Sequence, residues 1–322
     1  MSRVVVAGSF NVDHAWHCPA LPRAGETLAG SYATGPGGKG FNQAVAAAAA
    51  GAATTFICAL GDDEGGRLAR RLAASRGIDL RAQAASAATG TAGIFVDASG
   101  RNSIVIGPGA NAELSVDFVS AQGVAIAEAA VVLAQLESPV DAIVEALRLA
   151  RASGALTVLN PAPANAACER ALLAVADVLT PNETEFAALL HRYCGEAVDP
   201  AALVAMDDER LHRLARTLCP RGTLVLTLGA AGCFVSHRED TLRGDDEAHY
   251  RCPAAEARTV DTTGAGDAFN GALAASLALH ADRTFAAGVR RACRFAALST
   301  ERPGAAASMP SAAEVEARFG RD

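Results

Sequence analysis

The stretch of sequence that decides the fold reads Asp261-Thr262-Thr263-Gly264-Ala265-Gly266-Asp267-Ala268-Phe269-Asn270-Gly271. Before it, Ala257–Val260 has the composition of a short strand, and after it, Ala268–Leu279 is almost wholly apolar over a helical length. We therefore predict a strand, a tight glycine turn and a buried helix that begins near Gly266. The N–H groups at such a helix N-terminus, with the positive end of the helix dipole, form a site for an anion.

Asp267 falls in the first turn of the predicted helix, beside this anion site. An aspartate near a helix N-terminus often does no more than cap the helix. A carboxylate beside a bound phosphate can instead take the proton from a hydroxyl group that attacks the phosphorus. The residues alone leave both interpretations open.

The pattern D-T-x-G-A-G-D-x-F-x-G in this stretch resembles the C-terminal motif of the ribokinase (PfkB) family of carbohydrate kinases. The resemblance implies that Asp267 is the catalytic base, and that the backbone N–H groups of Gly264, Ala265 and Gly266 form the anion hole. It extends over roughly residues 3 to 315, with further motifs in the order of the family.

Composition argues against several classes of protein. The formal net charge of −7 over 322 residues disfavours general nucleic-acid binding. The longest apolar run, Ala44–Leu60, is alanine-rich and too short for a membrane span, so we interpret it as a buried helix followed by a strand at Thr54–Leu60. The first residues do not resemble a secretory signal.

The eight cysteines are scattered, and no two of them form a C-x-x-C pair. This spacing suggests neither a zinc site nor a disulfide framework, and it fits a protein of the reducing cytoplasm. Of the 28 Lys and Arg residues, Lys39 is the single lysine. Because it lies inside a glycine loop, we expect a specific need for a compact ammonium group there.

An apolar strand near the N-terminus runs into the polar sequence Gly8-Ser9-Phe10-Asn11-Val12-Asp13-His14. It lacks the G-x-G-x-x-G pattern of a dinucleotide site. Asn11 and Asp13 would share one face of an extended segment, and a simple turn after the strand is an equal alternative. The sequence is similar to the family's G-S-x-N-x-D-H motif, which implies that both side chains hold sugar hydroxyls.

A glycine-rich loop, Gly35–Gln43, opens the alanine-rich helix. It is not a Walker loop, because neither Ser nor Thr follows Lys39. It resembles the family's G-G-K-G-x-N-Q-A motif, which implies that Gly38, Lys39 and Asn42 bind the sugar. The resemblance also places Glu137, at the end of a predicted strand, in the sugar site.

The resemblance further implies a small β-sheet lid over the sugar, with strands within about 14–36 and 90–107. Alternating residues predict a hairpin formed by Thr91–Val96 and Asn102–Ile106. We expect apolar lid residues such as Ile94 and Ile106 to cover the substrate. A homodimer that forms through the lid is a further implication of the resemblance.

From residue 125 onward, predicted strands alternate with helices, which is typical of a parallel sheet covered on both faces. The predicted elements are strands at Ala130–Leu136, Ala155–Asn160 and Leu224–Leu228, and a helix at Val140–Ala152. We predict one domain over 1–322, a three-layer αβα sandwich with a mostly parallel central sheet plus the β lid. Polar residues follow the strand ends, where open α/β sheets bind ligands.

The sequence Asn182-Glu183-Thr184-Glu185 has two compatible interpretations. Asn182 and Glu185 have the spacing of a helix capping box. They also match the family's N-x-x-E motif, which implies that Glu185 helps to hold hydrated Mg²⁺ and that Asn182 lies near the phosphates of ATP. The resemblance assigns the nucleotide loop to Thr227, Gly229 and Gly232. Cys293 stands where relatives often carry His or Asn near the adenine, which leaves the nucleotide preference open.

The tail Ser299–Ser308 resembles the loop that completes a monovalent cation site in ribokinases. The resemblance implies ligands, mostly backbone carbonyl oxygens, from Asp261, Thr263, Ser299, Arg302, Gly304 and Ser308. Hard oxygen ligands of this kind suit K⁺.

The resemblance as a whole implies a kinase that transfers the γ-phosphoryl group of ATP to the 5-hydroxyl of D-ribose. A nucleoside kinase or another sugar kinase of the family remains an alternative. Asn11 argues against deoxyribose, because relatives that act on deoxyribose tend to lack this residue. The third alternative, a sugar-binding regulator without catalysis, is disfavoured by the intact Asp267 and its G-A-G sequence.

Overall fold

The computed structural model describes residues 3–164 and 170–321. Its centre is a nine-stranded sheet in the order β13-β12-β11-β10-β9-β8-β1-β4-β5. The strands from β5 to β11 are parallel, and β12 and β13 continue the sheet in antiparallel pairing. The strands are β1 Arg3–Ala7, β4 Ala53–Leu60, β5 Asp79–Ala84, β8 Ala129–Ala134, β9 Leu156–Leu159, β10 Val178–Leu179, β11 Thr223–Thr227, β12 Cys233–Ser236 and β13 His249–Cys252.

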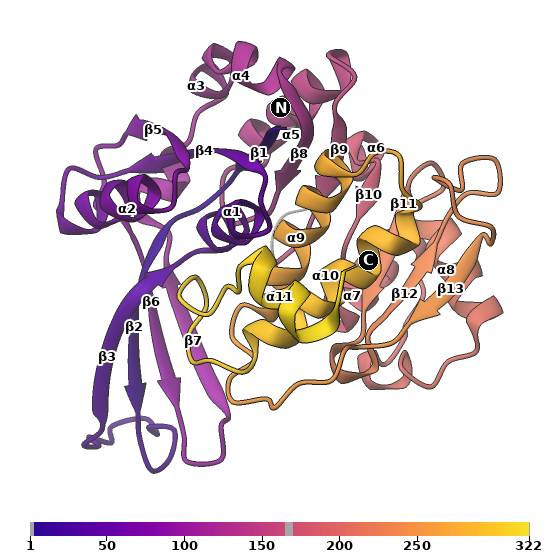
Figure 1. Ribbon diagram of the computed structural model, residues 1–322. Coiled ribbons are helices and arrows are strands. Elements are labelled where there is room, and N and C mark those ends of the chain that lie inside the picture. Colours follow the sequence, from indigo (N-terminus) through magenta and orange to yellow (C-terminus); the bar gives the residue numbers. More distant parts are fainter. Residues whose placement is uncertain (1–2, 165–169, 322) are drawn as a thin grey trace.

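Helices cover both faces of this sheet (Figure 1). Alternate residues of β1 enter two separate cores: Val4 and Val6 pack on one face, and Val5 and Ala7 on the other. The first core is closed by α1 Lys39–Ala49, α2 Glu64–Ser75, α9 Ala265–Leu279, α10 Phe285–Ser299 and α11 Ala312–Phe319. The second is closed by α3 Val116–Ala121, α4 Gly123–Ala127, α5 Val140–Ala152, α6 Arg170–Val175, α7 Glu183–Cys194 and α8 Asp208–Leu218. The predicted three-layer αβα sandwich is therefore confirmed.

The helices α1 and α9 lie against each other, which decides where the site forms. Gly271 makes this possible, because a Cβ atom there would lie only 2.4 Å from the carbonyl oxygen of Gln43. A larger residue would force the two helices apart. Close packing therefore brings the first turn of α9 next to the first turns of α1.

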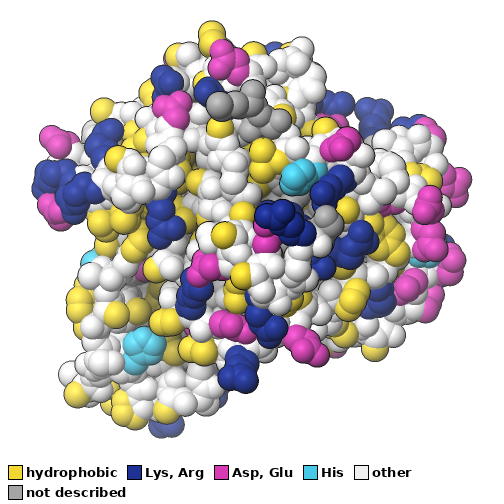
Figure 2. Space-filling view, viewed as in Figure 1, with side chains coloured by type: hydrophobic (Ala, Val, Ile, Leu, Met, Phe, Trp, Pro, Cys, Tyr) yellow, Lys and Arg dark blue, Asp and Glu magenta, His cyan; other side chains and the backbone are white. Residues whose placement is uncertain are grey.

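The second sheet is the predicted lid, with the strand order β3-β2-β6-β7. Its strands are β2 Asn11–His17, β3 Ser31–Gly37, β6 Gly90–Val96 and β7 Asn102–Gly107. It projects from the body of the molecule (Figure 1), and the predicted hairpin is confirmed as β6 and β7. Hydrophobic side chains appear on the visible surface of the lid in Figure 2, and Tyr32, Ile104 and Val105 are each more than half exposed.

One predicted strand is wrong. Residues 253–259 adopt no regular secondary structure, so the strand expected at Ala257–Val260 does not form. Val260 is 67% exposed, and its N–H donates to the carbonyl oxygen of Thr300 at 2.7 Å, as that of Asp261 does at 3.0 Å. The segment is thus fixed by the end of α10 instead of a neighbouring strand. None of the helices in the described part of the chain has the length and apolarity that a membrane span requires.

Candidate active site

Asp267 lies in the first turn of α9, where the sequence places it. The preceding Gly264 has φ of 76°, and a Cβ atom there would lie 2.8 Å from the Cβ of Ala305, so both backbone and space require glycine. The Asp267 carboxylate is buried and accepts hydrogen bonds from Asn42 Nδ2 and Gln43 Nε2, each at 2.9 Å. Its side chain therefore faces α1 and does not cap its own helix.

The N–H groups expected to form the anion hole are partly open. Ala265 N donates to the carbonyl oxygen of Thr262 at 3.2 Å. Among the described residues, no acceptor is bonded to the N–H groups of Gly264 and Gly266. Both glycines line a small cavity, of about 180 Å³, that also contains Asp267. A helix N-terminus with open N–H groups in a cavity can bind a phosphate oxygen.

Four carboxylates and one lysine set the electrostatics of the site. Burial, more than any other effect, raises the pKa of Asp267, although Lys39 acts in the opposite direction. Burial lowers the pKa of Lys39, but the nearby carboxylates of Asp267, Glu137 and Glu185 outweigh it, and the pKa is raised. Burial, followed by the charges of Glu137 and Asp267, raises the pKa of Asp13 to about 7. Lys39 therefore remains a cation close to Asp267, whose own pKa is raised by burial.

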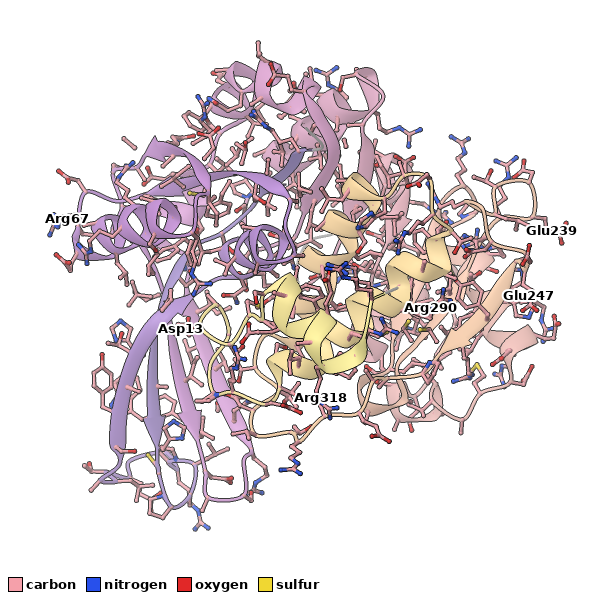
Figure 3. The ribbon with its side chains drawn as sticks, viewed as in Figure 1. Asp13, Arg67, Glu239, Glu247, Arg290 and Arg318 are labelled. Carbon is pink, nitrogen blue, oxygen red and sulfur yellow. The ribbon has the colours of Figure 1, made fainter. Side chains whose placement is uncertain are left out.

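The residues predicted to bind the sugar meet where the lid joins the body. Asp13 lies on β2 at this junction (Figure 3), and a Cβ atom on Gly37 would lie 2.2 Å from its carboxylate oxygens. Glu137 Oε2 accepts hydrogen bonds from Ser9 Oγ at 2.6 Å and from the Lys39 N–H at 2.9 Å. Gly38 precedes α1 with φ of 88°, a conformation that favours glycine.

Asn11 is buried at the start of β2, and Asn111 holds it there. Asn111 Nδ2 donates to Asn11 Oδ1 at 2.8 Å, and the Asn111 side chain also bonds the N–H and carbonyl oxygen of Phe10. Sequence reasoning missed Asn111, because no motif marks it. It also missed Gln43 and Asn160, which are joined by a 3.1 Å hydrogen bond behind Asp267. The position of Gln43 directly after Asn42 in the glycine motif is the signal that could have found it.

A larger cavity, of about 470 Å³, adjoins the small one and has the size of a small-molecule site. The two share Asn182, Thr227 and Gly266. The residues of the predicted nucleotide loop, Thr227, Gly229 and Gly232, all line the larger cavity, and so does Cys293.

Asn182 and Glu185 form the capping box that their spacing predicts at the start of α7. Asn182 Oδ1 accepts from the Glu185 N–H at 2.8 Å, and Glu185 Oε2 accepts from the Asn182 N–H at 2.9 Å. Both residues also line the 180 Å³ cavity. Burial raises the pKa of Glu185, and Lys39 opposes this shift. Asn182 and Glu185 thus cap α7 and at the same time line the small cavity.

The residues of the predicted monovalent cation site lie around the loop after α10. Asp261 accepts hydrogen bonds from the N–H and hydroxyl of Thr263, at 2.8 and 2.6 Å, and from the N–H of Gly304 at 2.8 Å. Partial burial raises the pKa of Asp261, but these hydrogen bonds outweigh it, and the pKa is lowered. Ser299 and Ser308 are buried and donate to carbonyl oxygens of their own segments, and Arg302 pairs with Glu314.

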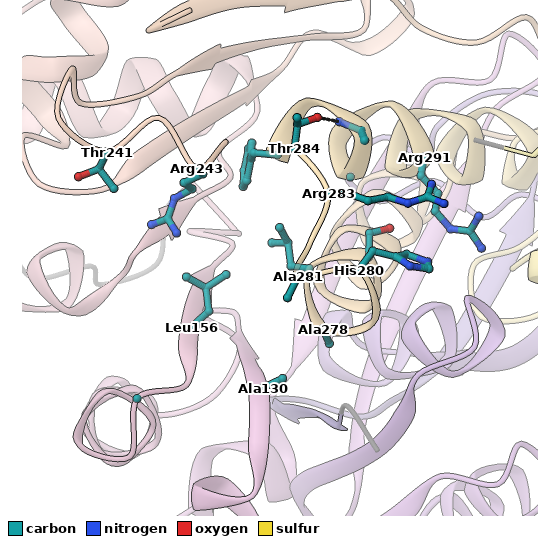
Figure 4. Close-up of a pocket in the computed structure, with 16 residues that line it drawn as sticks. Ala130, Leu156, Thr241, Arg243, Ala278, His280, Ala281, Arg283, Thr284 and Arg291 are labelled. Atoms are coloured by element: carbon teal, nitrogen blue, oxygen red, sulfur yellow. Dashed lines mark hydrogen bonds between the residues drawn. The ribbon is translucent and has the colours of Figure 1, made fainter. Parts of the chain in front are cut away.

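A further cavity, of about 610 Å³, lies near the amino ends of β8 and β9 (Figure 4). Ala130 and Leu156, near the starts of β8 and β9, line it together with residues between α9 and α10. None of the predicted site residues lines this cavity. The cavities at the carboxyl ends of the strands are therefore the ones that adjoin Asp267, as expected for an open α/β sheet.

Comparison with known proteins defines the class. Residues 1–312 match the pfkB family carbohydrate kinases, and the chain belongs to this family. It is 36% identical over 318 residues to the ribokinase of Haemophilus influenzae, a match that covers 97% of this chain and 96% of that protein. The resemblance found in the sequence motifs is confirmed.

Two further relatives show the same relationship. The chain is 38% identical over 283 residues to the bifunctional ribokinase/ribose-5-phosphate isomerase A of Fructilactobacillus sanfranciscensis, covering 86% of this chain and 49% of that protein. It thus spans about half the length of that relative. The structure of the Arabidopsis thaliana ribokinase complexed with ribose and ATP matches with a TM-score of 0.83 and 27% sequence identity, over 100% of both chains.

Proposed function

We propose that this carbohydrate kinase transfers the γ-phosphoryl group of ATP to the 5-hydroxyl of D-ribose. The observation that carries the proposal is the position of Asp267. Its buried carboxylate lies in the same small cavity as the open N–H groups of Gly264 and Gly266. The charge of Glu137 raises the pKa of Asp267, and the charge of Asp267 raises the pKa of Asp13, so both sugar-site carboxyls lie near the base. A base between a phosphate site and a polar sugar site is what phosphoryl transfer to a hydroxyl requires. The ribokinases among the relatives support ribose as the acceptor.

In this proposal, Asp267 takes the proton from the 5-hydroxyl as it attacks the γ-phosphorus. Asn42 and Gln43 hold the carboxylate in place through their two 2.9 Å hydrogen bonds. The N–H groups of Gly264, Ala265 and Gly266 stabilise the charge that develops on the transferred group. The Ala265 N–H then exchanges its Thr262 acceptor for the phosphate oxygen.

The sugar contacts in this proposal come from Asn11, Asp13, Gly38, Asn42 and Glu137, with Lys39 between sugar and phosphate. Thr227, Gly229 and Gly232 border the nucleotide. Glu185 would help to hold hydrated Mg²⁺, because a carboxylate oxygen is a ligand that Mg²⁺ accepts, and Asn182 would lie near the phosphates; both residues border the 180 Å³ cavity. The ion would supply charge neutralisation for the phosphates.

We further propose that the loop 299–308 and Asp261 hold K⁺. The support is the chemistry of the donors, which are carbonyl, carboxylate and hydroxyl oxygens, and the hydrogen bond from Gly304 that ties the loop to Asp261. The ligands would be Asp261, Thr263, Ser299, Arg302, Gly304 and Ser308. Asp261 lies only three residues before Gly264, so an ion here would order the backbone of the anion hole.

The remaining parts of the proposal concern the whole molecule. We take the chain as one kinase domain over 1–322 that forms a homodimer through its lid. Tyr32, Ile104 and Val105 support this proposal, because exposed hydrophobic side chains on the lid would be covered by the partner subunit. We also propose a cytoplasmic location, which the free thiols of the described cysteines support.

An acceptor panel tests the reaction. ATP consumption is measured with ribose, 2-deoxyribose, fructose and a nucleoside, and we expect the highest kcat/KM for ribose. A pocket built to bond a hydroxyl can reject the analogue without it by up to about 10⁴-fold. A higher kcat/KM for the nucleoside would overturn the ribose assignment, and sugar binding without any ATP consumption would instead indicate a regulator.

A further inference from the structure

Three cysteines far apart in the sequence form a cluster beside the 470 Å³ cavity. Cys233 on β12 pairs across the sheet with Cys252 on β13, and Cys293 on α10 lies over both. The Sγ atom of Cys293 is 3.9 Å from that of Cys233 and 3.9 Å from that of Cys252. All three Sγ atoms lie within 4.8 Å of one another, and all three side chains are buried.

We propose that this trithiol cluster, Cys233, Cys252 and Cys293, is a binding site for a single thiophilic metal ion such as Zn²⁺. Zinc binds thiolates at about 2.3 Å, and tetrahedral geometry then sets the sulfur atoms about 3.8 Å apart. Two of the separations in the cluster, Cys293 to Cys233 and Cys293 to Cys252, are both 3.9 Å and already match this requirement. Sites with three protein ligands leave the fourth position of the ion for an exogenous ligand.

The surroundings of the cluster are compatible with an ion. Three thiolates and Zn²⁺ carry a net charge of −1, and the cations of Arg290 and Arg294 act on Cys252 from α10. Arg290 on α10 (Figure 3) also lines a surface cavity together with Cys252. This surface cavity therefore adjoins the cluster through Cys252. The nearby positive charge offsets the negative charge of the loaded site.

The cluster is placed to affect nucleotide binding, an extension that rests on the proposed function. Cys293 lines the 470 Å³ cavity together with Gly229, Gly232 and Phe269. An ion held by Cys293 would lie against the wall of this cavity. Occupation of the site should therefore change the affinity for ATP, and by thermodynamic linkage ATP should change the affinity for the ion to the same degree.

Binding is tested on the reduced, metal-free full chain, without catalysis. Co²⁺ is titrated in and the near-ultraviolet absorption of thiolate-to-Co²⁺ charge transfer is recorded, followed by displacement with Zn²⁺. We expect one equivalent of Co²⁺ to develop the band, and binding to tighten as pH rises because thiols release protons. Cys252→Ser and Cys293→Ala should each bind at least about tenfold more weakly. Cys219→Ser is the matched control, since Cys219 is an equally buried thiol outside the cluster, and it should bind as the unchanged protein does.

Absence of the band in the unchanged protein would overturn the proposal, whatever the folding of the variants. An equal band in Cys252→Ser and Cys293→Ala would also overturn it. The coupling is read from the Kd of a fluorescent ATP analogue with and without Zn²⁺. A charge-transfer band in a protein that binds no nucleotide would support the metal site and count against the proposed kinase reaction, so the two failures are distinguishable.

Discussion

Gln43 on α1 and Asp267 on α9 are joined by a 2.9 Å hydrogen bond although 224 positions separate them in the chain. Gln43 is itself held from behind, because its Oε1 accepts a hydrogen bond from Gln135 and its Nε2 also donates to Asn160. The amide therefore has one fixed orientation and presents a donor to the carboxylate. This connection gives the buried Asp267 a defined position without neutralising it.

Asp267→Asn should remove turnover and leave both substrates bound. Asparagine retains the shape of the side chain but cannot act as a base, and loss of a general base costs about 10²–10⁴ in rate. One of the two donors, Asn42 or Gln43, would face an amide nitrogen, which costs about 1 kcal/mol of stability. The measurements are kcat, calorimetric binding of ribose and an ATP analogue, and the melting temperature. A variant that keeps more than about a tenth of kcat would exclude Asp267 as the base.

Asp13→Asn should stabilise the free protein, and increasingly so at higher pH. The pKa of Asp13 is raised by burial to about 7, so the folded state retains a proton that the unfolded state has lost above about pH 4. Stability from this group is therefore lost as pH rises from about 4 to 7 and stays low above that. After allowance for solvent screening, we expect a gain of about 1–3 kcal/mol at pH 8 and almost none at pH 4.

Chemical denaturation of both proteins across this pH range measures the difference. Asp62→Asn, at an exposed position, is the control, and it should change the free energy of unfolding little at any pH. A gain from Asp13→Asn that is constant with pH would show that Asp13 is ionised normally in the fold. The same variant should lose ribose affinity, because the sugar site would lose an acceptor.

The sequence predicts the parts of this molecule that local patterns determine. The helix at Val140–Ala152 is found with the predicted bounds, and the lid hairpin and the start of α9 agree within one residue. The strand expected at Ala257–Val260 fails, because strand formation also requires a partner in the sheet. Only the folded chain shows that the backbone there bonds to Thr300.

The residues of the candidate site likewise fall into those that local motifs predict and those that only the folded chain reveals. Residues inside compact motifs, such as Asn11, Lys39 and Asp267, could be selected because their neighbours in the chain mark them. Asn111 and the cysteine cluster could not, because their positions depend on packing between distant elements. The scattered cysteine spacing predicts no zinc site, yet β12, β13 and α10 bring three thiols together.

Potassium should increase the rate several-fold. An ion bound by the loop 299–308 would order the backbone between Asp261 and Gly264, which leads into the anion hole. Rates are compared in buffer with a bulky organic cation and after addition of KCl at constant ionic strength. Asp261→Asn should weaken the response, since it removes the charge that such an ion would meet. Equal rates with and without potassium would remove the cation site from the proposal.

Lys39 should serve substrate binding and the charge balance of the site more than it serves stability. It is half-buried with glycine on both sides, and the carboxylates of Asp267, Glu137 and Glu185 raise the pKa of its ammonium group. Both Lys39→Ala and Lys39→Arg should raise the KM for the sugar, because the planar guanidinium is larger and forms different hydrogen bonds. We expect the free energy of unfolding to change by less than about 1 kcal/mol in each.

The pH dependence of kcat separates the two Lys39 variants. Lys39 lowers the pKa of Asp267 against the effect of burial, so its removal should raise that pKa further. Since the base must be ionised, the acid limb of the profile should move to higher pH in Lys39→Ala and stay in place in Lys39→Arg. An early melting transition, or a Lys39→Arg enzyme with unchanged sugar KM, would show that the single lysine has a structural role or is an accident of composition. An unmoved acid limb in Lys39→Ala would show that Lys39 does not set the charge of the base.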